Sequence, residues 1–434
     1  MRRKIYDELL KWKNRNNRKP LVLNGARQVG KTWILKEFGT KEYDNVAYIN
    51  CDNNPTVKAM FSDYDTERMI RVFSALSGER IVPGKTLIII DEIQEEPRAL
   101  TSLKYFCEDA PQYHIAAAGS LLGLSTHEGS GYPVGKTDEL ILYPLSFMEF
   151  LDAAGKEILV EQMEKGRFEE LSLLSETLID LLRQYYYVGG MPEVVKTYLE
   201  TSDLQETRRI QKRILQDYRN DFSKHIPANM LGKVHLVWDS IPSQLAKENK
   251  KFMYSAIKKG SRAKDFEEAI EWLSDAGLVH KVKGLSKIEM PLKHYEKPEQ
   301  FKLFVNDLGL LGAMADVPAD RMLIDNSILS EYKGSFSEQY VFQQFASCGV
   351  QPYYYTNNKS TLEIDFVVQL DEVYPVEVKA EENVKAKSLR TLIQNNPELK
   401  GWRFSMLGYK DQEWMVNVPL YLVESWIKVQ KKEV

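Results

Sequence analysis

The sequence predicts an α/β protein that begins with a five-stranded parallel sheet and ends with a second α/β domain. Three observations support this fold class. Short apolar segments alternate with amphipathic helical segments through the first 145 residues, as in repeated βαβ units. Helical spacing of apolar residues then dominates up to about residue 290, and strands with alternating apolar and polar residues follow.

Length and composition set the broad class of the protein. Its 434 residues suit two to four domains, and 43% hydrophobic with 28% charged residues is typical of a soluble globular protein. No run approaches the ~20 apolar residues needed to span a bilayer, and the basic start lacks an apolar signal region. We therefore expect a cytoplasmic protein with no membrane partner. Cys51, Cys107 and Cys348 lie far apart without C-x-x-C spacing, which argues against a disulfide framework or structural zinc site.

The charge is unevenly distributed. The chain carries a net charge of −4, yet residues 201–290 hold 17 Lys and Arg against 12 Asp and Glu. Within this region, residues 247–264 hold seven bases and one acid. Such a stripe is a candidate DNA-backbone footprint, and a solvated helix face is the alternative explanation.

The first predicted strand runs into a glycine-containing turn and an apolar-periodic helix. Here "GARQVGKT" matches G-x-x-x-x-G-K-[ST] in the strand–loop–helix context of a P-loop. Gly25 and Gly30 allow the loop amides to face a phosphate, Lys31 can reach the β- and γ-phosphates, and the Thr32 hydroxyl can bind Mg²⁺. The residues expected to surround ATP are Gly25, Ala26, Arg27, Gln28, Val29, Gly30, Lys31, Thr32 and Asp91.

Two later strands end in polar residues that suit ATP hydrolysis. "KTLIIIDEIQ" places Asp91 to help Thr32 hold Mg²⁺ and Glu92 to polarise the attacking water, although acid pairs also cap helices. "YHIAAAGS" ends in Ser120, a candidate sensor of the γ-phosphate or a simple turn residue. The five strands are predicted at residues 21–24, 46–50, 87–91, 114–118 and 138–142.

Several segments resemble one family along nearly the whole chain: the bacterial and archaeal AAA-type ATPases with a C-terminal endonuclease-like domain. The resemblance is carried by "LNGARQVGKT", "IIIDEIQ", "AAAGS", "YPVGKTDELILYPLSFMEFL", "YYYVGGMPEVV", "FKLFVNDLGLLGA" and "KGSFSEQYVFQQF". Family members often have arginine where Lys136 stands, so a trans-acting arginine is not assigned. Arg98, Arg183 and Arg219 are alternative sources.

The middle of the chain is predicted to hold two helical modules. Residues 146–200 are expected to form a helical nucleotide lid behind the ATPase core of residues 1–145. Residues 201–290 include helix–turn–helix spacing followed by "GLVHKV", which suggests a winged helix. This module could place a helix in a DNA groove or act as a spacer between protein partners.

Residues 291–434 follow the order α-β-β-β-α-β. The resemblance implies a restriction-endonuclease-like domain, whose pattern is an Asp on one strand and Glu-x-Lys on the next. Here these are Asp365 and Glu377-Val378-Lys379, and Glu338 matches an additional acid on the preceding helix. In this interpretation Asp365 and Glu377 hold Mg²⁺ or Mn²⁺, Lys379 steadies the phosphate or attacking hydroxide, and Glu338 is a candidate ligand of a second ion.

The hairpin at residues 361–380 leaves one choice of register open. Its apolar residues share a face only if paired positions sum to an even number, which puts Asp365, Glu377 and Lys379 together on the other face. If the residue numbers of paired positions sum to 742, Asp365 lies opposite Glu377. Two like charges that face each other in this way destabilise the hairpin unless something neutralises them. Pairs that sum to 744 set Asp365 opposite Lys379 in an ordinary salt bridge.

These patterns predict an ATP-hydrolysing AAA-type ATPase that acts on DNA with a metal-dependent, nuclease-like C-terminal domain. The alternative is a nucleotide-gated regulatory or scaffolding switch, in which an inactive nuclease-like domain only binds a protein partner. An Asp365–Lys379 pair would favour the switch.

Overall fold

The computed structural model describes residues 1–52, 55–119, 133–247, 250–323, 330–357, 362–380 and 386–431. Contacts within the chain divide it into two compact units. The first unit is formed by residues 2–143 with the short segment 275–277, and the second by residues 144–274 and 278–434. The division at residue 143 lies close to the predicted end of the ATPase core at residue 145.

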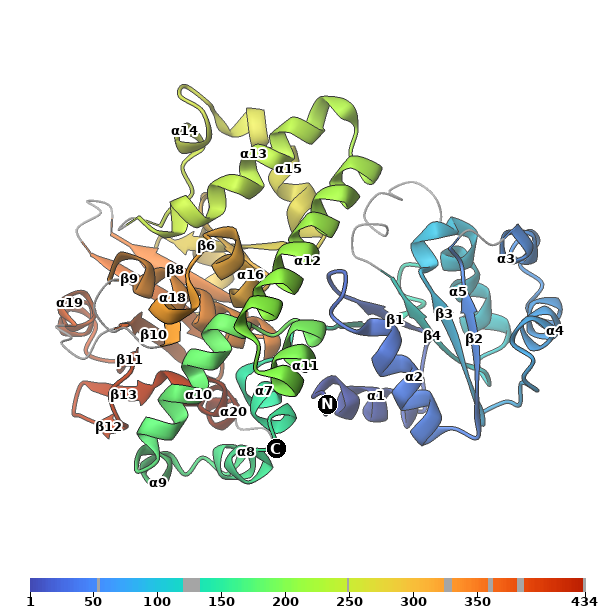
Figure 1. The fold of residues 1–434 in the computed structure, drawn as a ribbon, viewed down its shortest axis with the longest axis horizontal. Coiled ribbons are helices and arrows are strands. Elements are labelled where there is room, and N and C mark those ends of the chain that lie inside the picture. The colour runs from blue at the N-terminus through green and yellow to red at the C-terminus, as the bar shows by residue number, and fades with distance from the viewer. Residues whose placement is uncertain are drawn as a thin grey trace. The chain divides into compact units, whose positions relative to one another are not determined.

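The first unit is built on a five-stranded, fully parallel sheet (Figure 1). Its strands are β1 (Leu21–Asn24), β2 (Asn45–Asn50), β3 (Thr86–Asp91), β4 (His114–Ala118) and β5 (Asp138–Ile141). They lie in the order β2-β3-β4-β1-β5, and every neighbouring pair is parallel. The predicted sheet is therefore confirmed, with strand limits within one residue of those expected from the apolar runs.

Helices cover both faces of this sheet. On one face, Ile88 and Ile90 of β3 pack in one core with residues of α3 (Pro55–Met60), α4 (Thr66–Ser77) and α5 (Pro97–Asp109). On the other face lies α2 (Lys31–Glu42), where Gly39 sits so close to β2 that a Cβ would come within 2.5 Å of Val46. Helix α1 (Ile5–Lys13) packs against α2. Coverage on both faces explains the continuous apolar run of β3.

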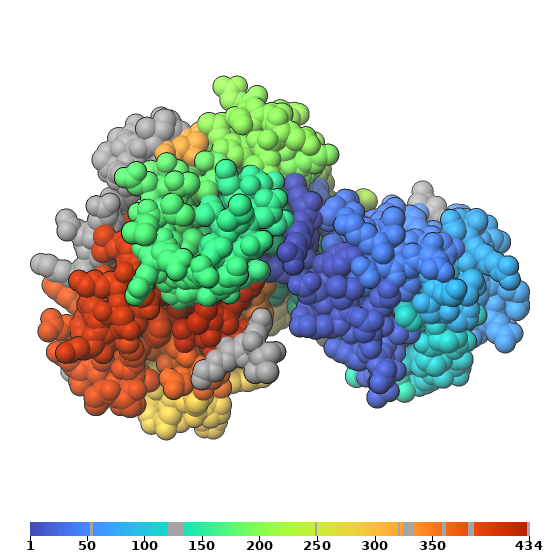
Figure 2. All heavy atoms as spheres, turned by 90° about the horizontal axis from the view of Figure 1, so that it is seen from below, coloured from blue at the N-terminus to red at the C-terminus, as the bar shows by residue number. Residues whose placement is uncertain are grey.

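The second unit begins with helices, as the apolar spacing predicts. These are α7 (Phe147–Ala153), α8 (Glu157–Glu164), α9 (Phe168–Ser172), α10 (Ser175–Val188), α11 (Pro192–Thr201), α12 (Leu204–His225), α13 (Ala228–Leu245), α14 (Tyr254–Ile257) and α15 (Ala263–Asp275). In Figure 2 the green residues of this helical segment lie against the red C-terminal residues. Two contacts between them are Ser425 Oγ donating to the Met163 carbonyl and an ion pair of Lys428 with Glu164. None of the described helices has the length and apolar character needed to cross a bilayer.

An eight-stranded mixed sheet forms the rest of the second unit. Its order is β12-β13-β11-β10-β9-β8-β6-β7. The strands are β6 (Val279–Leu285), β7 (Glu296–Val305), β8 (Pro352–Thr356), β9 (Glu363–Gln369), β10 (Val373–Val378), β11 (Gly401–Ser405), β12 (Lys410–Asp411) and β13 (Met415–Pro419). The helices around them are α16 (Leu308–Met314), α17 (Ala319–Leu323), α18 (Ser330–Ser347), α19 (Lys387–Asn395) and α20 (Val423–Gln430). From α18 to β11 the order is α-β-β-β-α-β, as predicted.

Strand β6 departs from the expectation of a separate winged-helix module. It pairs with β7 on one side over seven positions and with β8 on the other, so it belongs to the larger sheet. The predicted boundary at residues 290/291 falls between these two paired strands. An apolar strand pattern shows that a segment is extended but does not say which strand it will join. The four-part division of the chain stays a prediction.

The segments around Leu145 and Gly190 meet in the core of the second unit. The Leu145 N–H donates to the Gly190 carbonyl at 2.7 Å, and the Tyr185 hydroxyl donates to the Leu145 carbonyl at 2.5 Å. A Cβ at Gly190 would lie 2.1 Å from the Leu145 oxygen, so only glycine fits. Asp307 accepts the Gly190 N–H at 2.6 Å and the Leu310 N–H at 2.9 Å. Burial outweighs these bonds and raises the pKa of Asp307 to about 6.

Candidate functional site

The loop between β1 and α2 has the backbone of an anion-binding nest. Gly25, Gln28 and Gly30 all have positive φ, at 153°, 66° and 95°. A Cβ at Gly25 would lie 2.4 Å from the carbonyl oxygen of Leu142, which follows β5. Glycine at this position therefore lets the loop pack against the end of the neighbouring strand while its amides stay available to an anion.

Lys31 begins α2 and lies over the loop. Its Nζ donates to the carbonyls of Gly25 and Ala26, both at 2.9 Å. Burial lowers the pKa of Lys31 to about 8, although nearby Glu92 and Asp91 oppose this shift. A phosphate reaching the loop would give this ammonium a charged partner in place of two carbonyl oxygens.

Asp91 is held at the C-terminal end of β3. Its Oδ1 accepts the Thr32 hydroxyl at 3.2 Å and the Glu92 N–H at 3.1 Å, and its Oδ2 accepts the Tyr48 hydroxyl at 2.8 Å. The predicted Mg²⁺ ligands Thr32 and Asp91 are thus in direct contact. Tyr48 was not predicted, because a tyrosine inside a strand gives no sign that its hydroxyl will reach a neighbouring strand end.

Glu92 directly follows Asp91 in a left-handed backbone conformation, with φ of 51°. Its Oε2 accepts a 2.5 Å hydrogen bond from the Gln94 side chain, another contact that the sequence did not predict. The third predicted catalytic residue of this unit, Ser120, lies outside the described residues. Its role as a γ-phosphate sensor stays a prediction.

The candidate basic groups of the ATPase differ in their partners. Lys136 forms a 2.8 Å ion pair with Glu108. Arg183 and Arg219 pair with Asp180 and Asp239, respectively. Arg98 is exposed at the start of α5. Of the three candidate arginines, it is the one that forms no ion pair within the described parts of the chain.

The hairpin of β9 and β10 adopts the register that sums to 742. Gln369 pairs with Val373 and Phe366 with Val376, and continuing this register sets Asp365 opposite Glu377. Asp365 Oδ2 also accepts the Val378 N–H at 2.8 Å. The alternative in which Asp365 faces Lys379 is not adopted. Lys379 Nζ instead lies 2.8 Å from Glu377 Oε1.

Glu338 on α18 is buried between two lysines. Lys250 donates to its Oε1, and Lys302 Nζ lies 3.4 Å from its Oε2. Burial raises the pKa of Glu338, but Lys250 and Lys302 outweigh that effect and lower it overall. Across the described residues, no three Asp, Glu, His or Cys side chains form a group that could hold a metal ion. Glu338, the predicted ligand of a second ion, is instead held by the two lysines.

Lys302 is the main site residue that sequence reasoning missed. It lies on β7 with a fully buried side chain, 2.8 Å from Glu363 Oε1 and 5.1 Å from the centre of the Tyr354 ring. Burial lowers its pKa, but Glu338, Glu363 and Asp365 raise it well above its usual value. The available signal was a single lysine within the apolar stretch "FKLFV". A charged side chain in such a strand needs a buried partner.

Two carboxylates remain that fit one divalent cation. Glu377 is 4% exposed, and its Oε2 is a buried acceptor with no hydrogen-bond partner among the residues that the structure describes. Burial, followed by the nearby Glu338 charge, raises the pKa of Asp365 to about 7. An unpaired buried oxygen beside a second carboxylate suits a hard cation. Mg²⁺ commonly uses one or two protein carboxylates and completes its shell with water and phosphate.

The basic stripe flanks α14 and opens α15. Lys258, Lys259, Arg262 and Lys264 are all exposed, and none forms an ion pair with another described residue. The bases of α12 differ: Arg209, Lys212 and Arg213 each pair with an acid. The charges of Lys258, Lys259, Arg262 and Lys264 are thus not compensated by ion pairs within the described chain.

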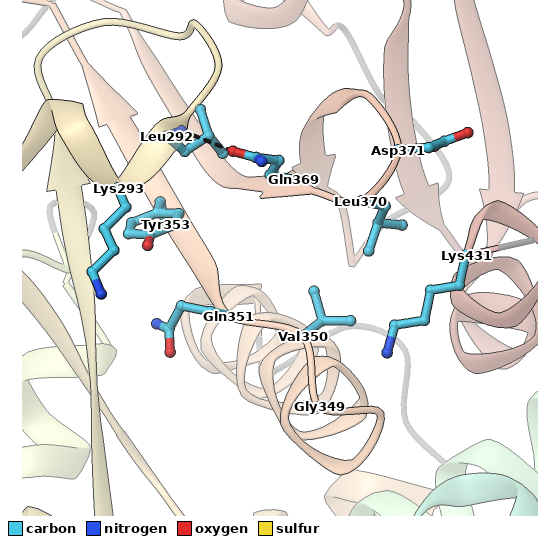
Figure 3. A pocket seen from close by; sticks show the side chains of 10 residues that line it. All are labelled: Leu292, Lys293, Gly349, Val350, Gln351, Tyr353, Gln369, Leu370, Asp371 and Lys431. Atoms are coloured by element: carbon cyan, nitrogen blue, oxygen red, sulfur yellow. Dashed lines mark hydrogen bonds between the residues drawn. The ribbon is translucent and has the colours of Figure 1, made fainter. Parts of the chain in front are cut away.

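A separate pocket of about 500 Å³ lies between the start of β8 and the end of β9 (Figure 3). Lys293 and Lys431 line it together with Tyr353 and Asp371, and Gln369 at its rim accepts the Leu292 N–H at 2.8 Å. None of the predicted site residues lines this pocket.

Comparisons with known proteins match three consecutive stretches of the chain. Residues 17–151 match an AAA domain, residues 179–321 a domain of unknown function (DUF8612) and residues 333–420 a domain of unknown function (DUF4143). The first match agrees with the P-loop geometry of the loop between β1 and α2 and supports a P-loop ATPase fold for residues 17–151. No curated protein matches the chain.

Solved structures with low sequence identity also align with the chain. A Walker-type ATPase of Pyrococcus abyssi is 14% identical, with 72% of this chain and 95% of that chain covered and a TM-score of 0.45. The ORC1 protein of Aeropyrum pernix, in complex with DNA, is 12% identical, with coverage of 74% and 92% and a TM-score of 0.28. The ORC2 protein of Aeropyrum pernix is 13% identical, with coverage of 74% and 89% and a TM-score of 0.33.

Proposed function

We propose that residues 1–145 bind Mg²⁺ and ATP and hydrolyse the β–γ phosphate bond. The observation that carries this proposal is the contact of Thr32 with Asp91 beside a loop whose amides and Lys31 can receive phosphates. Lys31 would exchange the Gly25 and Ala26 carbonyls for phosphate oxygens. Thr32 and Asp91 would hold Mg²⁺, which neutralises phosphate charge when bound.

Glu92 is the proposed base of this reaction. It follows Asp91 at the strand end, where its carboxylate can orient and polarise a water molecule directed at the γ-phosphate. The Gln94 amide on its Oε2 fixes the side chain. This assignment separates binding from chemistry: Lys31 acts on affinity, and Glu92 acts on turnover.

ATP binding and hydrolysis by variants test the assignment. Glu92→Gln should bind ATP normally and lose activity by about 100-fold or more, as expected for a general base. Lys31→Ala should lose ATP binding. Glu95→Gln is the matched control, because Glu95 is an exposed acid in the same turn. Unchanged ATP affinity in Lys31→Ala would refute the proposal.

We further propose that the second unit acts on DNA at Asp365, Glu377 and Lys379. The register that opposes the two carboxylates and the unpaired Glu377 Oε2 support a divalent cation at this position. The cation would polarise a phosphodiester and lower the pKa of its bound water. Lys379 is partly exposed next to Glu377, where it can turn to a phosphate oxygen or steady the attacking hydroxide.

The winged-helix prediction enters here as the source of DNA contacts. Lys258, Lys259, Arg262 and Lys264 of the stripe, which form no ion pair with a described residue, suit a phosphate backbone. Contacts of this kind weaken as salt increases. The helices α13 to α15 and the β6–β7 hairpin come from the same unit as the candidate site. DNA held by the stripe would therefore be held by the unit that carries the carboxylates.

Cleavage assays in Mg²⁺ or Mn²⁺ test this second activity. Linear, nicked, branched and single-stranded DNA should include at least one substrate that is cut. Asp365→Asn and Lys379→Ala should abolish cutting without unfolding the chain, because an Asn oxygen can still accept the Val378 N–H. Glu372→Gln, an exposed acid at the hairpin turn, should cut normally. No cutting of any substrate by the unaltered protein would refute the activity.

One observation favours the second candidate, a nucleotide-gated switch that binds a protein partner. With lysines on Glu338, Asp365 and Glu377 are the two carboxylates of the described site left for a cation, as in a nuclease-like scaffold that lacks chemistry. The switch predicts ATP-dependent capture of a protein partner with no DNA cleavage. The unpaired Glu377 oxygen favours the enzyme over this candidate.

A further inference from the structure

Lys250 reaches the candidate metal site from outside the nuclease-like segment. It lies in the segment before α14. In the same segment the Phe252 N–H donates to the Phe301 carbonyl at 2.8 Å, and the Phe252 and Phe301 rings stack with centroids 5.4 Å apart. This anchor on β7 brings the Lys250 ammonium to Glu338, and the Lys250 side chain is 11% exposed. The contact joins the basic stripe to the acid on α18.

Lys250 and Lys302 differ in what their departure from Glu338 would leave unpaired. Lys302 is fully buried and also pairs with Glu363, so its departure would strand a second carboxylate. Lys250 is the more accessible of the two, at 11% exposed against 0% for Lys302, and Glu338 is its ion-pair partner within the described chain. Of the two ammonium groups, Lys250 can move into solvent without unpairing any group other than Glu338.

A divalent cation and Lys250 are competitors at this site. A hard cation needs carboxylate lone pairs, and the Lys250 N–H bond occupies those of Glu338 Oε1. The Lys250 charge also acts on Asp365 and so repels a cation that approaches that carboxylate. While Lys250 holds its Oε1, Glu338 is not free to bind a cation.

We infer that Lys250 is a resident cation that keeps the site from loading metal until a DNA backbone draws it away. The inference rests on the proposed function, because it concerns the Asp365–Glu377 site. DNA is the chemistry that fits, because Lys250 belongs to the stripe that continues through Lys258 to Lys264, whose exposed charges have no acidic partners in the described chain. Phosphates bound along the stripe would offer Lys250 an alternative anion.

Metal binding to the full chain tests the inference. Mn²⁺ affinity would be measured by electron paramagnetic resonance without nucleotide, with binding to the C-terminal site taken as the part lost in Asp365→Asn. Lys250→Met should bind Mn²⁺ about tenfold to a hundredfold more tightly, the factor expected for removing a charged hydrogen-bond competitor. Lys250→Arg, which keeps the charge, should bind like the unaltered chain.

The role of DNA follows from linkage between the two ligands. If DNA removes Lys250 and so favours metal binding, Mn²⁺ must raise DNA affinity by the same factor. Fluorescence anisotropy with a cleavage-resistant phosphorothioate duplex would measure this effect. The effect should be larger in the unaltered chain than in Lys250→Met, where only the cation's own contact with the phosphodiester remains. Lys258→Met, a stripe lysine with no carboxylate partner in the described chain, should weaken DNA binding while leaving the Mn²⁺ effect intact.

The outcomes separate the inference from the proposed function. Equal Mn²⁺ affinity in Lys250→Met and the unaltered chain would overturn the inference while leaving the metal site in place. Tighter binding in Lys250→Arg as well would also overturn it, since packing rather than charge would then be responsible. If neither the unaltered chain nor Lys250→Met binds more Mn²⁺ than Asp365→Asn, both the inference and the metal site fail.

Discussion

Replacing Lys302 with methionine should destabilise the second unit strongly. Lys302 is fully buried between Glu338 and Glu363, at 3.4 and 2.8 Å. Removing one partner of a buried ion pair costs about 3–5 kcal/mol, because the remaining charge is left uncompensated. Lys250 still neutralises Glu338, so we expect the lower end, about 3 kcal/mol. In a unit of this size that loss corresponds to a fall in melting temperature of about 6–12 °C.

The assay compares thermal unfolding of Lys302→Met with that of Lys297→Met. Lys297 lies on the same strand and forms no ion pair with a described residue, so its replacement should change stability by less than about 0.5 kcal/mol. Hydrogen exchange should localise the loss to peptides of β7 and α18. Adding Glu363→Gln to Lys302→Met should restore part of the stability, since it removes the unpaired charge. A loss in Lys302→Met no larger than that of the control would refute the reasoning.

Three further changes test other parts of the structure. Asp91→Asn should weaken the Mg²⁺-dependent part of ATP binding, measured by calorimetry with and without Mg²⁺, and equal binding would contradict the ligand role. Gly190→Ala should cost about 2–4 kcal/mol of unfolding free energy because its Cβ meets the Leu145 oxygen, whereas Gly232→Ala, with open space around it in α13, should be neutral or stabilising. Burial raises the pKa of Asp307 to about 6, so between pH 4 and 6 the folded state binds more protons than the unfolded state. As the pH rises from 4 to 6, the unfolding free energy of the unaltered chain relative to Asp307→Asn should therefore fall by about 3 kcal/mol. A difference in unfolding free energy that does not change with pH in denaturant titrations would contradict this.

The ATPase sheet could be predicted because its signals are local. The apolar run before Asp91 and the P-loop ending at Thr32 are contiguous patterns whose spacing is set by one strand, one loop and one helix. The contacts added by Tyr48 and Gln94 could not be predicted in the same way. They depend on which side chains from neighbouring elements happen to reach Asp91 and Glu92.

The C-terminal site shows where local pattern stops being sufficient. Alternation along β9 and β10 required Asp365, Glu377 and Lys379 to share a face, but it left two registers open. In the structure the Leu370 N–H donates to the Glu372 carbonyl and closes the turn between β9 and β10. The hairpin with this turn has the register in which Asp365 lies opposite Glu377. Register in a hairpin is fixed by such turn geometry as well as by the apolar pattern.

The lysine partners of Glu338 were beyond sequence reasoning for a different reason. Lys302 comes from β7 and Lys250 from the segment before α14, and both lie more than thirty residues away from Glu338 along the chain. Nothing in their local pattern identifies the acid they will meet. Only the joining of β6 and β7 to the C-terminal strands in one sheet brings them to the site.

The measurement that tests the central claim most directly is DNA cleavage with and without ATP by the unaltered chain, Lys31→Ala and Asp365→Asn in Mn²⁺. Our account predicts that the unaltered chain cuts DNA and that ATP changes the rate. Lys31→Ala should cut at a rate that no longer responds to ATP, and Asp365→Asn should not cut while still hydrolysing ATP. Equal cleavage by the unaltered chain and Asp365→Asn would contradict the account.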